Sequence, residues 1–484
     1  MKLIFRLFSF LSFLLFIVPA VQAQKTCNCP EAFRWTKETF EKNDAGFEYA
    51  IQQKGRDMYD KHTAIFSERV KTVKDQYECA EVLSEWLKFF RKGHLSIGVL
   101  GVASQPGEPA VNTKQWPVLT VSEKDIRQKA GKDEKDYAGI WHTGAYTIGI
   151  VKEGKSYKGV ILESTNPDWK RQQVKMEIKE DGSGIYYMGN FSPAKFDKIE
   201  WMGKNAVKLT PSVMLERVFP KFSDTEDQKL YLRELFAKKP FVERLSKETL
   251  LLRIPSFGDQ QKPVIDSVLS AFDKEIKSTK NLIIDIRNGT GGSDDSYTNL
   301  IPLLYTNPIR IVGLEFLSTP LNNKRMEGYL SLPDLSEKSR KQVNDALKLL
   351  NDNLGKFVNL NGVRRVTIQK LDTVLPFPQQ VAVIANEANG STDEQFLLAA
   401  KQSKKVKIFG KTTFGVLDIS NMYSAKSPDG MFELGYCLSK SYRIPGMAID
   451  NIGIQPDYFL DATIPNELWV KYAASVLENR EFQQ

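Results

Sequence analysis

The chain has 484 residues, of which 42% are hydrophobic and 26% are charged, a composition typical of a soluble globular protein. Because a single hydrophobic core rarely serves a chain of this length, we expect two or three domains. The formal charge of +8 is spread along the chain without a basic tract that carries interleaved aromatic residues, which argues against nucleic acid or an anionic membrane as a partner.

Residues 1–23 have the pattern of a secretory signal peptide. Lys2 and Arg6 give a positively charged start, and a nearly continuous apolar run follows from Leu7 to Val18. Val21-Gln22-Ala23 then offers small residues for cleavage after Ala23. The apolar run is short for a permanent membrane span, and no second candidate follows, although a retained anchor is the alternative. We therefore predict an exported protein, periplasmic or secreted, with no stable membrane span after removal of the leader.

Four cysteines follow the predicted cleavage point, and an oxidising compartment favours disulfides. Cys27 and Cys29 are too close for an easy mutual bridge, so one of them is predicted to pair with Cys79. Cys437 lies in a strand-like segment and is expected to be a small buried hydrophobic residue. The set lacks the spacing and the nearby histidines of a metal site, so no metal is expected.

Residues 24–99 are predicted to be mainly helical. Val82, Trp86 and Phe89–Phe90 recur on one helix face. The Lys92-Gly93 pair ends this helix, and a strand-like alternation begins at His94.

Residues 100–245 begin as a proline-containing connector and then change to a β pattern. Short alternating segments separated by glycine turns run from Tyr137 to about Leu209. They predict a small antiparallel sheet or half-barrel.

Residues 246–484 alternate between strand and helix. Residues 250–254, 282–286, 380–385 and 406–409 are strand-like, and residues 264–276 are helical. This order predicts an α/β core, a layered sheet covered by helices. Residues 334–354 are predicted to form a polar amphipathic helix inserted between core units.

Ser391 lies where the apolar strand 380–385 runs into a helix start, within Asn389-Gly390-Ser391-Thr392-Asp393-Glu394. Helix N-termini favour negative charge, so an oxyanion formed by attack of this hydroxyl would be partly solvated in advance. Ser391 and Glu394 also match the S-x-x-E capping box, which is the structural alternative to a nucleophile.

A serine nucleophile needs a base, and this chain has three histidines. His62 is predicted on a solvated helix face and His142 within a strand. His94 lies at a junction of helix and strand, where a side chain can project into a cleft, although it could instead be a charge partner of the helix C-terminus.

The segment from Asp285 to Ser293 places Gly289, Gly291 and Gly292 directly after a buried strand, where glycine lets backbone amides approach a ligand closely. It lacks the Gly-Lys-Ser/Thr of a Walker loop and the last glycine of a dinucleotide turn. An oxyanion donor or a tight turn are the remaining interpretations. Asp450 could orient a histidine as the third member of a triad, or it could be a turn former.

Together these segments resemble the S41 family of serine peptidases, which includes the C-terminal processing (tail-specific) and tricorn-core proteases. The resemblance covers residues 94–96 and most of residues 250–458. It is carried by Asp285-Ile286-Arg287-Asn288 with Gly291-Gly292, by Ser391–Glu394, by Gly410–Gly415, and by the segment from Asp450 to Asp457. It implies a ClpP/crotonase-like layered α/β core.

The family has two catalytic designs, and one residue discriminates between them. The Ser–Lys branch carries its lysine directly after Thr-Phe-Gly, where this chain has Val416. The tricorn-like branch uses a histidine from the N-terminal region and an acidic residue before Asn-x-Gly-x-x-Pro-Asp, and His94 and Asp450 match these positions. The resemblance therefore implies Ser391 as nucleophile, His94 as base and Asp450 as orienting acid, with the amides of Thr392 and Gly291 or Gly292 binding the oxyanion.

Three features depart from the family pattern. The residue before His94 is Gly93 where the tricorn-like pattern has serine, the acid is Asp where that pattern has Glu, and residues 100–245 show no evident PDZ module. The expected function is an exported serine endopeptidase that acts on peptides or unfolded proteins without a cofactor.

Two alternatives stay open. One is a catalytically inactive exported binding or scaffold protein with a peptidase fold. The other is an α/β hydrolase of esters or glycans, although the Gly-x-Ser-x-Gly elbow is missing. The sequence leaves the oligomeric state open.

Overall fold

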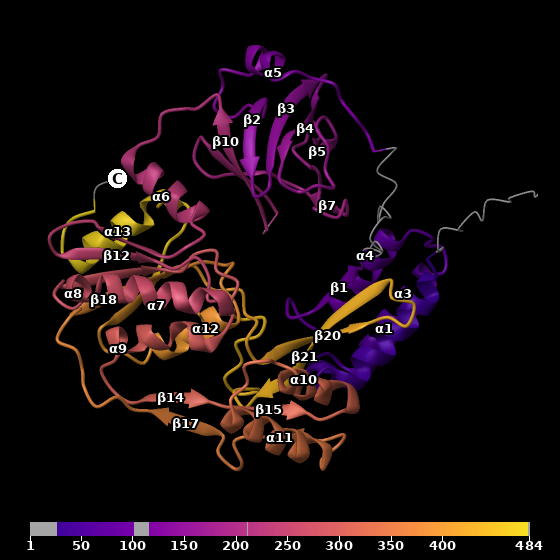
Figure 1. The fold of residues 1–484 in the computed structure, drawn as a ribbon, viewed down its shortest axis with the longest axis vertical. Helices are drawn as coiled ribbons and strands as arrows, with labels where there is room; N and C mark the ends of the chain where they lie inside the picture. The colour runs from indigo at the N-terminus through magenta and orange to yellow at the C-terminus, as the bar shows by residue number, and fades with distance from the viewer. Residues whose placement is uncertain (1–26, 101–115, 211, 483–484) are drawn as a thin grey trace, which may run out of the picture.

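The computed structural model describes residues 27–100, 116–210 and 212–482, so the predicted signal peptide lies outside the described residues. Figure 1 shows the sheet that contains β2, β3 and β10 at the top, an α/β core at the left and a helical region at the right. A helical hairpin lies at the bottom of the same view.

The α/β core is built on a six-stranded sheet in the order β11-β12-β13-β18-β19-β22. All neighbours are parallel except β11 and β12. The strands are β11 (Phe241–Arg244), β12 (Thr249–Arg253), β13 (Asn281–Asp285), β18 (Gln380–Ala385), β19 (Val406–Gly410) and β22 (Tyr458–Phe459). Because β13 and β18 are adjacent and parallel, the loops that follow them meet at one edge of the sheet.

Helices cover both faces of this sheet, as the near-continuous apolar runs of its strands require. Leu250 and Leu252 pack with α7, α9 and α12, while Leu251 and Ile283 face α13. The helical segments of the core are η2 (Asp259–Gln261), α7 (Lys262–Ala271), α8 (Asp273–Ile276), η3 (Asp294–Leu300), α9 (Ile301–Leu304), α12 (Thr392–Ala400), η4 (Asn466–Leu468) and α13 (Trp469–Leu477). The predicted strand–helix alternation is therefore present, whereas the ClpP/crotonase-like description of the layers stays a prediction.

A second sheet combines a strand from the N-terminal region with strands from the C-terminal half of the chain. Its long strand β21 pairs with β20, β1 and β15, and β15 pairs with β16. The strands are β1 (Ser96–Val99), β15 (Leu314–Leu317), β16 (Phe357–Val358), β20 (Ile419–Lys426) and β21 (Phe432–Ser441). The N-terminal region that carries His94 thus shares a sheet with the C-terminal third of the chain.

Four N-terminal helices pack against β21, with Phe40 and Trp86 in the same cluster as Phe432 and Tyr436. They are α1 (Cys29–Asn43), α2 (Phe47–Lys54), α3 (Arg56–Arg69) and α4 (Gln76–Leu87). A disulfide joins α1 to α4.

That disulfide links Cys29 and Cys79 across a sequence separation of 50 residues. Of Cys27 and Cys29, the two partners predicted for Cys79, Cys29 is therefore the one that forms the bond. Cys27 and Cys437 are free and buried, as expected for Cys437.

One prediction for the helical region is wrong. His62 does not lie on a solvated face, because its ring stacks on Phe89 at 4.8 Å between centroids. Its Nε2 also lies 3.1 Å from the carbonyl oxygen of Trp86. Phe89, in the turn after α4, and Phe66, on the same helix as His62, provide this apolar cover.

The nine-stranded sheet is antiparallel throughout, in the order β7-β6-β5-β4-β3-β2-β10-β9-β8. It runs beyond the predicted end near Leu209, because β10 continues to Phe219. The strands are β2 (Gly139–Thr143), β3 (Tyr146–Glu153), β4 (Ser156–Ser164), β5 (Val174–Ile178), β6 (Gly184–Tyr187), β7 (Pro193–Phe196), β8 (Glu200–Trp201), β9 (Ala206–Thr210) and β10 (Val213–Phe219). Two helices flank it, α5 (Glu123–Lys129) and α6 (Glu226–Phe236).

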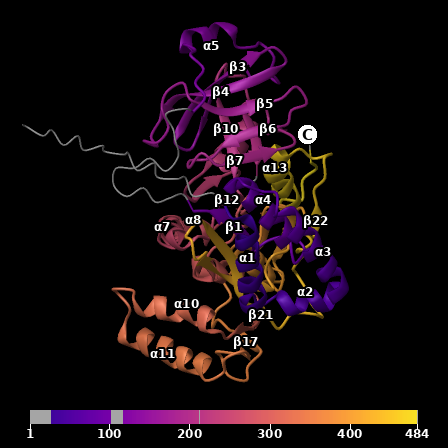
Figure 2. The same ribbon diagram turned by 90° about the vertical axis from the view of Figure 1, so that its right-hand side faces the viewer.

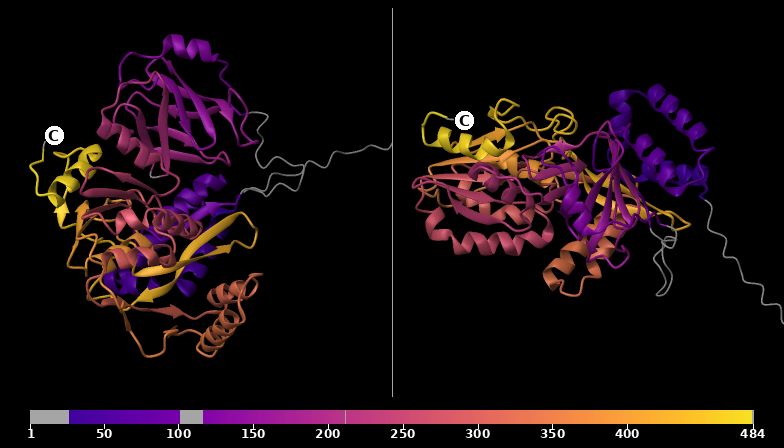
Figure 3. Two further views of the ribbon diagram at one scale, coloured as in Figure 1. Left: turned by 60° about the vertical axis from the view of Figure 1, so that its left-hand side comes forward. Right: turned by 90° about the horizontal axis from the view of Figure 1, so that it is seen from above.

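The predicted insertion is a helical hairpin of α10 (Pro320–Leu330) and α11 (Glu337–Asn351). Figures 2 and 3 show it projecting from the core on the side opposite the nine-stranded sheet. The ribbon of β14 (Ile309–Val312) and β17 (Val366–Gln369) connects it to the core. Within the described residues, no helix combines the length and apolarity needed to cross a membrane.

Candidate active site

Ser391 occupies a sharp turn between β18 and α12. Its backbone has φ 60° and ψ −122°, a conformation that costs a non-glycine residue about 1–3 kcal/mol and concentrates at functional sites. The Ser391 N–H donates to the carbonyl of Val416 at 3.1 Å and to Oε2 of Glu394 at 3.2 Å. These two contacts hold the strained turn in place, and the second belongs to the predicted capping box.

Glu394 ties this turn to the loop that follows β19. Its buried carboxylate accepts the backbone N–H groups of Gly415 at 2.8 Å and Val416 at 2.9 Å, and the hydroxyl of Thr413. Burial raises its pKa, and the hydrogen bonds from these donors oppose that rise. A residue expected only as a helix cap therefore fixes the whole segment beside the serine.

Gly291 brings the loop after β13 directly against the serine. Its φ is 83°, and a Cβ placed there would lie 2.7 Å from the Cβ of Ser391 and 3.1 Å from the amide nitrogen of Thr392. Only glycine permits this approach and this conformation. The predicted neighbourhood of Gly291, Ser391 and Thr392 is therefore present.

The three expected oxyanion donors differ in their availability. The amide of Gly291 donates to Oδ2 of Asp393 at 3.3 Å. The amides of Gly292 and Thr392 donate to no other described residue, while the Thr392 hydroxyl binds the carbonyl of Gly292 at 3.0 Å. Gly292 and Thr392 are thus the amides that are free to receive an oxyanion.

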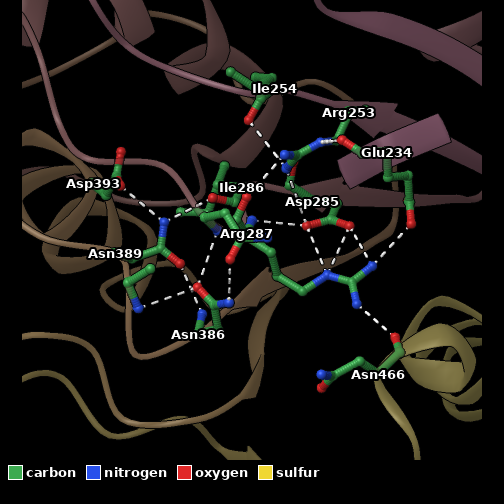
Figure 4. A network of polar contacts seen from close by, with 12 residues as sticks. Glu234, Arg253, Ile254, Asp285, Ile286, Arg287, Asn386, Asn389, Asp393 and Asn466 are labelled. Atoms are coloured by element: carbon green, nitrogen blue, oxygen red, sulfur yellow. Dashed lines mark hydrogen bonds and ion pairs between the residues drawn. The ribbon is translucent and has the colours of Figure 1, made fainter. Parts of the chain in front are cut away.

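A buried polar network holds the two loops together (Figure 4). Asn389 donates to Oδ2 of Asp393 at 2.8 Å and to the carbonyl of Ile286 at 2.7 Å. Asn386 donates to Oδ1 of Asn288 at 3.0 Å. Burial raises the pKa of Asp393 to about 7.

The same network continues into the sheet through charged residues (Figure 4). Arg287 pairs with Asp285 at 2.7 Å and with Glu234 at 2.9 Å, and all three side chains are buried. Burial alone would raise the pKa of Asp285, but the positive charges of Arg287 and Arg253 hold this pKa below its ordinary value. These ion pairs stabilise the strand end from which the glycine loop departs.

His94 is half-buried, and its ring is oriented by a backbone carbonyl. Its Nδ1 lies 2.7 Å from the carbonyl oxygen of Ile419. Because a carbonyl can only accept, Nδ1 carries the proton of the neutral ring and Nε2 presents the lone pair. Burial lowers the pKa of His94 below its ordinary value of 6.5, which keeps the ring neutral at neutral pH.

A buried ion pair supports the backbone of His94. Arg91 pairs with Asp44 at 2.7 Å and donates to the His94 carbonyl at 3.0 Å. This contact supports the positive φ of 56° at His94. Hydrogen bonds to the backbone and to the ring of His94 therefore orient this residue at the junction of helix and strand.

Asp450 does not bind the imidazole. Its Oδ1 accepts the amides of Leu417 at 2.5 Å and Asp418 at 2.6 Å, and its Oδ2 accepts the amide of Ile419 at 3.1 Å. Burial and the charge of Asp418 raise its pKa to about 6. The expected contact of Asp450 with His94 is replaced by a contact with Ile419, the residue whose carbonyl orients the ring.

Val416 lies between the two halves of the site. A Cβ at Gly93 would lie 2.7 Å from its Cγ1, and a Cβ at Gly390 would lie 2.6 Å from its Cγ2. The residues next to Gly93 and Gly390 are His94 and Ser391. The structure therefore brings the histidine segment and the serine segment against the same buried valine.

Comparisons with known proteins agree with this architecture. Residues 248–315 and 357–460 match the model of peptidase family S41. No curated protein matches the sequence.

The solved structure of a CPAF mutant aligns over 94% of this chain and 99% of its own, with 13% identity and a TM-score of 0.51, which shows a shared fold. The photosystem II D1 C-terminal processing protease aligns over 90% of this chain and 94% of its own, with 11% identity and a TM-score of 0.37. The tricorn protease aligns over 93% of this chain and 37% of its own, with 13% identity and a TM-score of 0.40.

The α/β core carries the match to a family of serine-type peptidases. Residues 248–315 and 357–460, the matched part of the chain, are similar to peptidase family S41. The resemblance inferred from the sequence motifs is thereby confirmed at the level of the family.

Proposed function

We propose that this protein is an exported serine endopeptidase in which Ser391 is the nucleophile, His94 the base and Asp450 the third member of the triad, which acts on His94 through Ile419 and not by direct contact. The observation that carries the proposal is the strained Ser391 turn at the start of α12, against which Gly291 packs. Such a turn exposes a side-chain oxygen beside backbone amides.

In the proposed reaction, Oγ of Ser391 attacks a peptide carbonyl while Nε2 of His94 takes the hydroxyl proton. The amides of Thr392 and Gly292 stabilise the oxyanion, because neither is used by another described residue. His94 then returns the proton to the leaving amine, and water releases the acyl group by the reverse sequence.

The proposed base has the protonation state that this reaction needs. Burial lowers the pKa of His94, so the neutral ring predominates at neutral pH. The hydrogen bond from Nδ1 to the Ile419 carbonyl selects the tautomer in which Nε2 accepts a proton.

Export is supported by the disulfide between Cys29 and Cys79, since disulfides persist in oxidising compartments. The substrates follow from the family, whose members cleave peptides. We therefore propose peptides or unfolded proteins outside the cytoplasm as substrates.

The test compares Ser391→Ala and His94→Gln with wild type in the cleavage of casein and in labelling by a fluorophosphonate probe. Each variant should lose several orders of magnitude in kcat/KM, and Ser391→Ala should not be labelled. Ser270→Ala, on the exposed face of α7, is the matched control. Cleavage by Ser391→Ala at the wild-type rate would refute the proposal.

A further inference from the structure

We infer that Asp418 and Arg443 are positioning residues of the active site, which act with Asp450 to aim the Ile419 carbonyl at the imidazole of His94. The inference rests on the proposed role of His94 as the base. It explains how the site orients a histidine whose ring binds no carboxylate among the described residues.

The carboxylates of Asp418 and Asp450 each accept hydrogen bonds from backbone amides at and next to the other residue. Oδ2 of Asp418 accepts the amides of Ile449 at 2.5 Å and Asp450 at 2.9 Å. In return, Oδ1 of Asp450 accepts the amides of Leu417 and Asp418. This reciprocal arrangement joins residues 417–419 to residues 449–450, so neither segment can shift without breaking charge-assisted hydrogen bonds.

Ile419 transmits this arrangement to the imidazole. Its N–H donates to Oδ2 of Asp450 at 3.1 Å, and its carbonyl lies 2.7 Å from Nδ1 of His94. In an extended strand the N–H and C=O of one residue point to the same side. Fixing the N–H of Ile419 therefore fixes the direction of its carbonyl.

Arg443 supplies the positive charge that this pair of buried carboxylates needs. Its Nε donates to Oδ1 of Asp418 at 2.8 Å, and its Nη1 donates to Oε1 of Gln395 at 3.3 Å. Gln395 lies on α12, one helical turn after Ser391. Arg443 thus links the support of His94 to the helix that begins at the nucleophile.

These contacts predict a loss of rate without a loss of substrate binding. Asp418→Asn should lower kcat about 100-fold, the cost of misplacing a catalytic group by about 1 Å, while KM stays within twofold of wild type. Arg443→Met should do the same, because it leaves Asp418 buried without its counter-charge. Arg443→Lys keeps the charge and should recover part of kcat.

A matched control separates positioning from general destabilisation. Arg217 is also fully buried, but it lies in the nine-stranded sheet and donates to the carbonyls of Glu134 and Asp136. Arg217→Met should lower the melting temperature at least as much as Arg443→Met while leaving kcat within twofold of wild type.

A second measurement does not depend on peptidase activity. In protein labelled with ¹⁵N-histidine, the Nδ1–H resonance of His94 should be protected from exchange, and His94→Gln assigns it. Asp418→Asn and Arg443→Met should broaden or shift this resonance and leave those of His62 and His142 unchanged.

The two measurements keep the inference separate from the proposed function. An unchanged His94 resonance together with wild-type kcat in Asp418→Asn and Arg443→Met would overturn the inference. If Ser391→Ala retained full activity, the proposed function would fall, and the resonance would still test the positioning of His94. If Asp418→Asn does not fold, the comparison of Arg443→Lys with Arg443→Met decides.

Discussion

Val416 fills the space that a side chain at Gly93 would need. A Cβ at Gly93 would lie 2.7 Å from Cγ1 of Val416 and 2.8 Å from Cε1 of Phe414, closer than packed carbon atoms approach. The valine at the position of the dyad lysine and the glycine before the histidine are thus complementary. The close contact between the two positions therefore explains both the valine at 416, where the Ser–Lys branch has lysine, and the glycine at 93, where the tricorn-like branch has serine.

Gly93→Ser should therefore impair the site rather than restore the tricorn-like pattern. Overpacking beside His94 is expected to cost about 1–3 kcal/mol of stability and at least tenfold in kcat/KM. Val416→Ala opens the same space, so the double variant should recover activity relative to Gly93→Ser. Kinetics and thermal melts of the three variants test this, and a Gly93→Ser enzyme faster than wild type would contradict it.

Glu394→Gln should loosen the nucleophile turn. The carboxylate accepts from Ser391, Gly415 and Val416, and an amide group would turn a donor toward some of these N–H groups. Each buried N–H left unpaired costs about 1–3 kcal/mol, so the melting temperature and the rate of fluorophosphonate labelling should both fall. Glu387→Gln is the control, because the Glu387 side chain is 59% exposed; equal effects of the two variants would argue against the role of Glu394.

The pH profile of kcat/KM should have an acidic limb with a midpoint below pH 6.5. The pKa of His94 is lowered from 6.5 by burial, so the base stays neutral to lower pH. Protonation of Asp450, whose pKa burial raises to about 6, weakens its hold on the Ile419 amide in the same range. Asp450→Asn should therefore give a shallower limb that one ionisation describes, and an unchanged profile would count against this coupling.

The same two groups affect stability with opposite signs. Asp450, with its folded-state pKa raised from 3.8 to about 6, contributes stability that is fully present below pH 3.8 and is lost as the pH rises through 6. His94, with its folded-state pKa lowered, contributes stability that is present above pH 6.5 and is lost as the pH falls. The two contributions to stability partly cancel between pH 7 and pH 5, so activity should decline in this range with a smaller change in melting temperature than the larger contribution alone would give.

Removal of the disulfide should destabilise the helical region. Closing a loop with a sequence separation of 50 residues is worth at most about 4 kcal/mol by the chain-entropy estimate. Cys29→Ser or reduction by dithiothreitol should lower the melting temperature, whereas Cys27→Ser, which breaks no disulfide but places a hydroxyl at a buried position, should lower it less. Equal melting temperatures for Cys29→Ser and wild type would contradict this role.

Local patterns predicted most of the elements. Strand–helix alternation after residue 246 predicted a layered sheet covered by helices. The neighbourhood of Gly291 and Ser391 was implied by the family resemblance, and the structure explains it by the parallel pairing of β13 and β18, which brings their following loops to one edge of the sheet.

The remaining features depend on contacts between distant segments. Ile419 carries no side-chain signal for a role that its carbonyl performs, and Asp418 and Arg443 meet only through the packing of β20 and the loop after β21. The stacking of His62 on Phe89 likewise joins α3 to the turn that follows α4. Such pairings have no local sequence pattern.

The sheet made by β1, β20 and β21 also determines when the site can exist during synthesis. His94 leaves the ribosome nearly 300 residues before Ser391, yet Cys437 and Ile419 supply contacts that hold its ring and backbone. On the proposed mechanism, a nascent chain has neither a nucleophile nor an oriented base until its last third has been made. If the proposed function holds, cleavage of substrates begins only after the segment of His94 has packed against β20 and β21, which delays activity without a separate inhibitor.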